Sequence, residues 1–243
     1  MTYSDSHVHF TKINTIESLS SNMRINCVTN TAKEYRLARK IYNSMKHITV
    51  SAGYHPLYYT KSSKELDDYL SIMEEQRFIG EIGLDIKSIL DLNYQKEVLR
   101  EIIRTANLFK AQVISLHNRE TFRESTDIVS DFQGITIFHR FNGNVQDCNY
   151  VLNNPKWYVS INPILISDND WNIIKNIPLK QLLLETDAPF TLKETSTYDI
   201  NYIIFLYNLM AKKLVMKVED LVEQIDSNYS FVFESKGVES IIL

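Results

Sequence analysis

The feature that most constrains this chain is a repeated alternation of short apolar runs with longer amphipathic segments. The runs that we expect to form β-strands are Ile25–Thr29, His47–Ser51, Arg77–Gly80, Gln112–Leu116, Ile135–Phe138, Trp157–Ile161 and Gln181–Leu184. A first strand is expected to end in the segment DSHVHF, residues 5–10. The segments that we expect to be helical are Ala32–Met45, Glu65–Glu75, Tyr94–Lys110, Arg123–Asp131, Ile200–Leu214 and Val218–Ile225. Such alternation is typical of βα units in a parallel sheet.

These segments predict about eight parallel strands, the number that closes a (β/α)8 TIM-type barrel. The 243 residues match the size of one such domain, and the chain contains no internal repeat or Gly/Ser-rich linker. We therefore expect residues 1–243 to form a single domain of the α/β class. Ser62 and Ser63, before Glu65, and Asn93, before Tyr94, are expected to cap helices, because short polar side chains bind free amides.

The composition is that of an ordinary globular protein, with 44% hydrophobic and 23% charged residues. The formal net charge of -4 means that any contact with nucleic acid needs a local basic surface. Cys27 and Cys148 are too few for a disulfide framework or a cysteine metal site, which favours a reducing cytoplasm. The start of the chain, MTYSDSHVHF, lacks a signal-peptide pattern, and no apolar run is long enough for a membrane span. We expect a cytoplasmic protein without a membrane partner.

Polar residues fall where the expected strands end. In a parallel barrel, the carboxyl ends of the strands and the loops that follow them build the active site. The segments TVSAGYHP, FIGEIGLD, VISLHNR, TIFHRFNG and LLLETDAP place potential metal ligands there, namely His55, Glu81, His117, His139, Glu185 and Asp187. This placement predicts that these side chains gather at one end of the barrel.

His7 and His9 are separated by one residue in the first expected strand. Because side chains alternate along a strand, both imidazoles project to the same face. A single histidine after a strand is usually a loop or core residue. Here, however, five of the six histidines, all except His47, lie at or just beyond the end of an expected strand. Neutral imidazoles and carboxylates bind zinc, manganese or iron, and a carboxylate such as Glu81 can bridge two ions.

The motifs resemble those of the TatD family of metal-dependent deoxyribonucleases, a branch of the amidohydrolase-like barrels. The resemblance covers most of the chain and consists of DSHVHF, GYHP, GEIGLD, a helix with Gln95 that leads to SLHNR, FHRFNG and LLLETDAP, in that order. GEIGLD and LLLETDAP are its most specific motifs.

The resemblance implies a site with two divalent metal ions, magnesium, manganese or zinc. One ion would lie among His7, His9, Glu81 and Asp187, and the other among Glu81, His117 and His139. His55 and Arg119 would face the scissile phosphate, and Glu185 would orient a ligand. The implied catalytic residues are Asp187, Glu81, His55 and Arg119, with Asp187 as acceptor of a proton from water. The implied activity is metal-dependent cleavage of DNA as a 3'-5' exonuclease.

The chain departs from the family pattern outside the expected ligands. Asn142 and Gly143 occupy the place of a usual serine, and Ile86 and Lys87 replace an aromatic residue after GEIGLD. The segment FTLKETSTYDI lacks the usual Asn-Glu-Pro sequence. We therefore expect a complete metal site whose substrate contacts depart from those of the family.

Two other functions remain open from the sequence. The same metal site could hydrolyse a small amide, ester or lactone, which accords with the net negative charge. A catalytically inactive binding subunit is the third reading, although every expected ligand is present. A serine nucleophile and a bound nucleotide cofactor lack support, because the chain has no GxSxG, GxGxxG or GxxxxGK[ST] motif.

Overall fold

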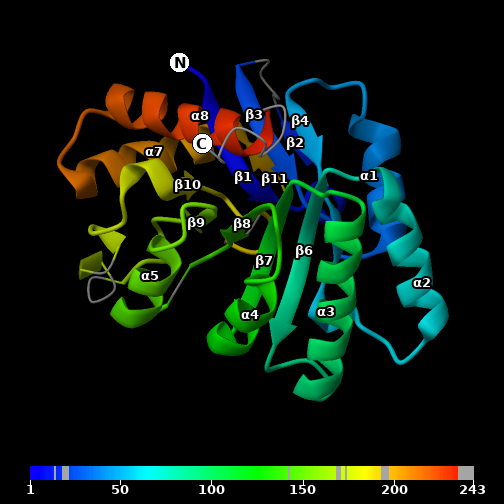
Figure 1. The fold of residues 1–243 in the computed structure, drawn as a ribbon. Coiled ribbons are helices and arrows are strands. Elements are labelled where there is room, and N and C mark those ends of the chain that lie inside the picture. The colour runs from blue at the N-terminus through cyan, green and yellow to red at the C-terminus, as the bar shows by residue number, and fades with distance from the viewer. Residues whose placement is uncertain are drawn as a thin grey trace.

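The computed structural model describes residues 1–13, 15–17, 22–141, 143–167, 171–172, 174–192 and 197–234. Strands and helices alternate along most of this chain, as Figure 1 shows. The described strands are β1 (Tyr3–Val8), β2 (Thr15–Glu17), β3 (Met23–Cys27), β4 (Ile48–Val50), β5 (Ala52–Tyr54), β6 (Phe78–Asp85), β7 (Val113–Arg119), β8 (Ile135–Phe138), β9 (Trp157–Ile161), β10 (Leu182–Leu184) and β11 (Thr197–Asp199).

Every pair of neighbouring strands is parallel. One sheet has the order β1-β3-β4, a larger one has the order β10-β9-β8-β7-β6-β5, and β11 pairs with β2. The α/β class with parallel sheets is therefore confirmed.

The two larger sheets follow one another in a ring. On one side only Ser51 separates β4 from β5, and its amide donates to the carbonyl of Cys27 in β3 at 2.9 Å. On the other side the amide of Asp187 donates to His7 O at 2.9 Å, and the amide of His9 donates to Ala188 O at 2.8 Å. These bonds join β1 to the segment after β10, so the two larger sheets are linked at both ends, as a (β/α)8-type barrel requires.

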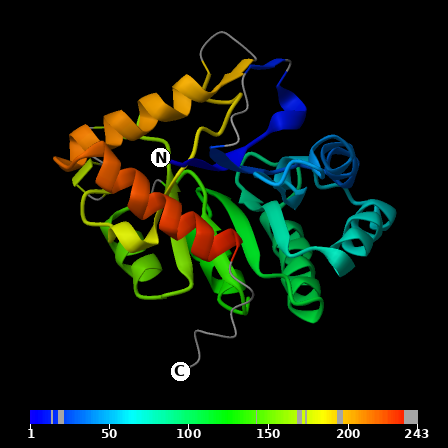
Figure 2. The ribbon, with the colours of Figure 1, turned by 90° about the horizontal axis from the view of Figure 1, so that it is seen from above.

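The helices lie around the outside of the strands, as Figure 2 shows. They are α1 (Ala32–Tyr42), α2 (Ser63–Ile72), α3 (Leu92–Leu108), α4 (Phe122–Val129), α5 (Val145–Leu152), α7 (Ile200–Leu214) and α8 (Val218–Phe233). Helix α3 illustrates why they pack there, because Val98, Leu99, Ile102 and Ala106 repeat at helical spacing and are all buried. The opposite faces carry polar residues toward solvent.

Two strands are longer than the sequence predicted, and this changes where the site residues lie. Strand β6 was expected to end at Gly80 but continues to Asp85, and β7 continues past Leu116 to Arg119. The polar residues Glu81 and His117 suggested that the strands end there. Both strands nevertheless continue, because they are buried on both faces and remain hydrogen-bonded to each other. Glu81 and His117 therefore lie within strands.

Other boundaries also need correction. Strand β3 ends at Cys27, and the expected His47–Ser51 strand is β4 alone, whereas β8, β9 and α7 match the prediction. Strand β5, which follows Ser51, was not expected. Helix α8 continues beyond Ile225 because Tyr229, Val232 and Phe233 extend its buried face. Asn93 lies inside α3, whose N-terminal cap is Asp91, and Ser62 makes no side-chain cap bond.

None of the helices in the described part of the chain is long and apolar enough to cross a membrane.

Candidate metal centre

The buried carboxylate of Glu81 lies at the centre of the polar site. Its oxygen Oε2 is 3.5 Å from His7 Nε2 and 3.3 Å from His9 Nε2. The other oxygen, Oε1, is 2.7 Å from His117 Nδ1, 3.2 Å from His139 Nε2 and 3.4 Å from His55 Nε2. The structure thus brings together five histidines from distant parts of the sequence, with a different set on each oxygen.

Strand β1 and the residue directly after it supply two of these rings. Val8 packs into the apolar core, while His7 and His9 on either side of it are buried in the polar site. Their Nε2 atoms lie 3.2 Å apart. The alternation of side chains along an extended segment therefore puts both rings on one face, as the sequence predicted.

Asp187 lies beside His9, with Oδ1 3.7 Å from His9 Nε2. Its backbone is in the left-handed region, with φ of 51°, which is uncommon for a residue other than glycine. The hydrogen bond from its amide to His7 O holds this turn against β1. The carboxylate is thereby aimed into the site instead of following the direction of β10.

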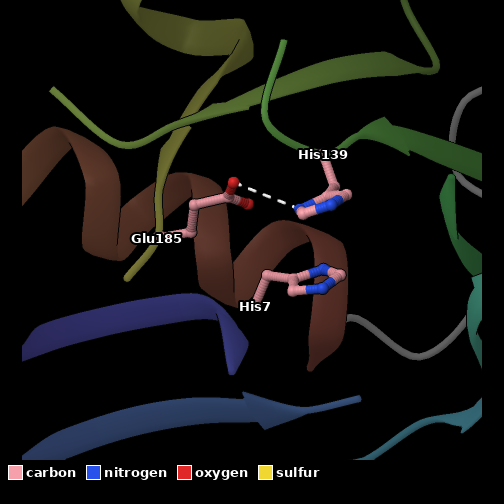
Figure 3. Close-up of side chains that lie close together, drawn as sticks. All are labelled: His7, His139 and Glu185. Atoms are coloured by element: carbon pink, nitrogen blue, oxygen red, sulfur yellow. Dashed lines mark hydrogen bonds and ion pairs between the residues drawn. The ribbon is translucent and has the colours of Figure 1, made fainter. Parts of the chain in front are cut away.

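Three of the histidines are oriented through their second ring nitrogen. Ser115 Oγ is 2.9 Å from His7 Nδ1, and Asp85 Oδ2 is 2.8 Å from His117 Nε2. Glu185 Oε1 is 3.2 Å from His139 Nδ1, the contact drawn in Figure 3. Each contact leaves the remaining nitrogen of the ring directed at Glu81 or His9. Such partners commonly fix the tautomer and orientation of metal-binding imidazoles.

His55 differs from the other four histidines. Its Nδ1 accepts a hydrogen bond from the amide of Leu57 at 3.1 Å, so this nitrogen carries no proton. A neutral ring must then carry its proton on Nε2, which makes that atom a donor and unsuited to hold a metal ion. The geometry supports a contact of His55 with substrate oxygen.

The donor set fits divalent metal ions. Donors about 2.1 Å from a tetrahedral ion lie about 3.4 Å from one another. The separations around Glu81 Oε2 and His9 fall in the same range, from 3.2 to 3.7 Å. Groups of three donors that lie within 4.8 Å of one another include His7, His9 and Asp187. Glu81, His117 and His139 provide nitrogen and oxygen donors on the other side.

Burial and charge set the protonation of the free site. Burial, helped by the nearby His139, lowers the pKa of His7 to about 3, so its ring is neutral. Burial would raise the pKa of Glu81, but His55, His139 and His117 outweigh it and hold the pKa well below its usual value. Burial raises the pKa of Asp187. An ionised Glu81 beside a neutral His7 attracts cations.

The site opens into a cavity of about 400 Å³. Arg119 and Arg140 line it on the side of β7 and β8, and both side chains are more than a third exposed. Leu57, Tyr58 and Phe190 form its apolar rim, and each is exposed. A larger cavity of about 660 Å³ also includes Tyr58, but no candidate metal-binding group of the described residues lies in it.

Sequence reasoning missed several residues of this site. Asp85, Ser115 and Arg140 contact the expected ligands, and Asn30 lines the cavity. Asp85 stands in the GEIGLD motif and Arg140 follows His139, so sequence proximity could have indicated both. Ser115 and Asn30 carry no such indication, because serine and asparagine are common near strand ends.

Comparisons with known proteins identify the family of this chain. The family model described as TatD related DNase matches residues 4–234. A TATDN1 homologue of Vairimorpha ceranae is 28% identical over 141 residues, which cover 57% of this chain and 51% of that relative. The chain thus spans about half the length of the first curated relatives that it matches. An uncharacterized metal-dependent hydrolase of Buchnera aphidicola subsp. Baizongia pistaciae is 24% identical over 207 residues, 76% of this chain and 77% of that protein.

Solved structures show the same fold. YJJV, a TatD homologue from Escherichia coli K12, superposes with a TM-score of 0.81 at 18% identity, covering 96% of this chain and 98% of that chain. A TatD family hydrolase from Entamoeba histolytica gives a TM-score of 0.79 at 17% identity, covering 96% and 99%. Because the family model spans nearly the whole described chain, this protein belongs to the TatD related DNase family.

Proposed function

We propose that the protein is a divalent-metal-dependent hydrolase that cleaves phosphodiester bonds of DNA, as a 3'-5' exonuclease. Its family supports the reaction class. We further propose that His7, His9, Glu81 and Asp187 hold one ion, and that Glu81, His117 and His139 hold the other.

The observation that carries the proposal is that the two carboxylate oxygens of Glu81 face different sets of histidines. Its Oε2 faces His7 and His9, whereas its Oε1 faces His117 and His139. A carboxylate placed in this way can bridge two cations. When bound, such a pair supplies a hydroxide at neutral pH and stabilises charge on the attacked and departing oxygens of a phosphodiester.

The remaining polar residues are suited to handle substrate and protons. His55 presents a donor nitrogen beside the carboxylate of Glu81, where it can bind a phosphate oxygen. Arg119 lines the same cavity, and its planar guanidinium can donate two parallel hydrogen bonds to phosphate. The carboxylate of Asp187, with a pKa raised by burial, is the acceptor for the proton of the attacking water.

The apolar rim supports a nucleotide substrate. Tyr58 and Phe190 are exposed by 41% and 59%, although large aromatic side chains usually find cover. Both line the cavity that contains the polar site. Flat aromatic surfaces of this kind stack on nucleobases without requiring one sequence.

The experiment that tests the proposal compares two substrate panels. The purified protein, loaded with manganese, is given single- and double-stranded DNA in one panel and small esters, amides and lactones in the other. We expect shortening of DNA from the 3' end, abolished by a chelator. Hydrolysis of small substrates alone would favour the second candidate, which a cavity of about 400 Å³ could accommodate. Bound metal without activity in either panel would indicate an inactive binding subunit.

A further inference from the structure

Arg140 occupies a special position between a proposed metal ligand and the open cavity. Its Nη1 donates to Asp187 Oδ2 at 2.9 Å, while the other oxygen of Asp187 faces His9. The carboxylate can therefore keep Arg140 on one oxygen and a metal ion on the other. Of the five N–H groups of the guanidinium, the described residues engage one.

The backbone at Arg140 directs the side chain toward this place. Its φ of 46° is left-handed, and its amide donates to Glu185 Oε1 at 2.9 Å. Residues other than glycine adopt this conformation rarely, and functional sites are among the places where they do so. The side chain is 38% exposed and lines the cavity of the metal centre.

Arg119 lies on the other side of a small space next to Arg140. A side pocket of about 50 Å³ is lined by His117, Asn118, Arg119, His139 and Arg140. Arg119 Nη1 is 3.5 Å from Asp85 Oδ2, and its side chain is 36% exposed. Two guanidinium groups therefore flank one polar pocket beside the proposed metal ligands.

Charge balance indicates what this pocket binds. Four buried carboxylates surround the centre, those of Glu81, Asp85, Glu185 and Asp187. These carboxylates and two divalent ions balance one another in charge, so the guanidinium groups of Arg119 and Arg140 add positive charge beside the centre. The side pocket lies next to the proposed ligands, and a second phosphate there can accept from both guanidinium groups.

We infer that Arg140, together with Arg119, forms a subsite for a second phosphate next to the scissile one. This inference rests on the proposed phosphodiesterase function and specifies its substrate: a nucleotide chain with two neighbouring phosphates. The second phosphate is either the next internal one or a phosphate at the chain terminus. Arg140 positions Asp187 through Oδ2 and binds the second phosphate through its remaining N–H groups.

The kinetic test compares substrates that differ by one phosphate. Thymidine dinucleotide dTpdT has only the scissile phosphate, whereas pdTpdT, dTpdTp and dTpdTpdT each have one more. For wild type we expect kcat/KM to be about ten- to a hundredfold higher with the second phosphate, mainly through KM. Comparison of pdTpdT with dTpdTp shows on which side of the scissile bond the subsite lies.

For Arg140→Ala we compare kcat/KM on two-phosphate substrates with kcat/KM on the one-phosphate substrate. We expect the ratio of these two values to fall to about one. Arg140→Lys keeps the positive charge but loses the planar guanidinium with its paired N–H donors, so it should give an intermediate ratio. Arg104→Ala is the matched control, since Arg104 is exposed on α3 and pairs with Glu101 of the same helix. An unchanged ratio in Arg140→Ala would overturn the subsite.

Binding provides a readout that does not need turnover. Titration calorimetry on the metal-loaded protein compares thymidine 3',5'-bisphosphate with thymidine 5'-monophosphate. Wild type should bind the bisphosphate about tenfold or more tightly, and Arg140→Ala should bind both equally while retaining its metals. Bisphosphate selectivity without cleavage of any nucleic acid would refute the proposed function but keep the subsite. Cleavage of DNA without bisphosphate selectivity would refute the subsite but keep the proposed function. Metal loss in both Arg140→Ala and Arg140→Lys, with selectivity retained, would show that Arg140 only positions Asp187.

Discussion

At the scale of single residues, Glu81 has the most contacts with other proposed ligands. We expect Glu81→Gln to weaken both metal ions, because the neutral amide removes the charge that the two histidine sets share. The bound metal per protein, measured by elemental analysis after dialysis, should fall from about two to below one. The expected fall is large because a bridging ligand contributes to each site.

Glu185→Gln is a useful comparison for Glu81→Gln. Glu185 contacts His139 Nδ1 at the site, so its variant should lose about ten- to a hundredfold in metal affinity at one site. Circular dichroism checks that both variants remain folded. Full occupancy by two ions in Glu81→Gln would contradict the bridging role.

Arg119 is predicted to contact substrate without contributing to metal binding. Arg119→Ala should keep its metals and its thermal stability but lose about thirty- to a thousandfold in rate on phosphodiesters, the equivalent of about 2 to 4 kcal/mol. Its 3.5 Å contact with Asp85 is partly exposed, so loss of this contact costs little folding energy. Equal activity, or metal loss with unfolding, would show that Arg119 is a structural partner of Asp85.

At the scale of elements, Asn228 connects α8 to the start of β10. Its Nδ2 donates to Leu179 O at 2.6 Å and to Leu182 O at 2.7 Å, and the residue is buried. We expect Asn228→Ala to lower the free energy of unfolding by about 1 to 3 kcal/mol, because two carbonyls lose their donor. Urea denaturation measures the difference.

The matched control for Asn228 is Asn208→Ala in α7. Asn208 is exposed and bonds only to Ile204 O of its own helix, so the change should stay within about 0.5 kcal/mol. Both substitutions raise helix propensity equally. An Asn228→Ala protein as stable as Asn208→Ala would mean that this connection contributes nothing.

The elements themselves were largely predictable. Helix α7 and strands β8 and β9 follow the sequence pattern to the residue, because their apolar spacing is uninterrupted. The short strand β5 and the helix α5 were not recognised, although the sequence contains both segments. Ala52–Tyr54 is too short for a periodic pattern, and Val145–Leu152 has only two buried residues on its face.

At the scale of the whole molecule, metal binding should stabilise the fold. The proposed ligands come from β1, β6, β7 and the segments after β8 and β10, so bound ions tie both large sheets together. At about 100 times the dissociation constant, a ligand adds about 2.7 kcal/mol, which corresponds to about 5 to 10 °C in Tm. Differential scanning calorimetry with and without manganese measures this, and an unchanged Tm would argue against binding at this centre.

Metal binding should also release protons at neutral pH. Burial lowers the pKa of His139, but Glu185 and Glu81 outweigh it and hold the pKa well above its usual value. For His117, hydrogen bonds to Asp85 and Glu81 likewise outweigh burial and raise the pKa. Below these raised pKa values the rings carry protons in the free protein, and an ion must displace them.

The apparent metal affinity should therefore increase as the pH rises above 6.5, the ordinary pKa of histidine, and through the raised pKa values of these two rings. Raised pKa values in the free protein favour the protonated state below them, and this competition disappears above them. Calorimetry in two buffers with different ionisation enthalpies counts the released protons. An affinity independent of pH would show that both rings are neutral before the metal binds.

The sequence by itself determined the fold class and the order of most elements, and it predicted which residues are ligands. This is because periodic burial is a local property and because motifs such as GEIGLD and LLLETDAP specify chemistry within a few residues. It also predicted that His7 and His9 share a face, since that depends only on strand alternation.

Only the tertiary structure decided how these ligands are divided and oriented. That Glu81 Oε2 faces His7 and His9 while Oε1 faces His117 and His139 depends on the register of strands that are distant in sequence. The partners Ser115 and Asp85, and the bond from Arg140 to Asp187, depend on the same packing. Contacts between side chains on different strands depend on how all the strands pack together. No local sequence pattern encodes the distance between two side chains that are far apart in the sequence.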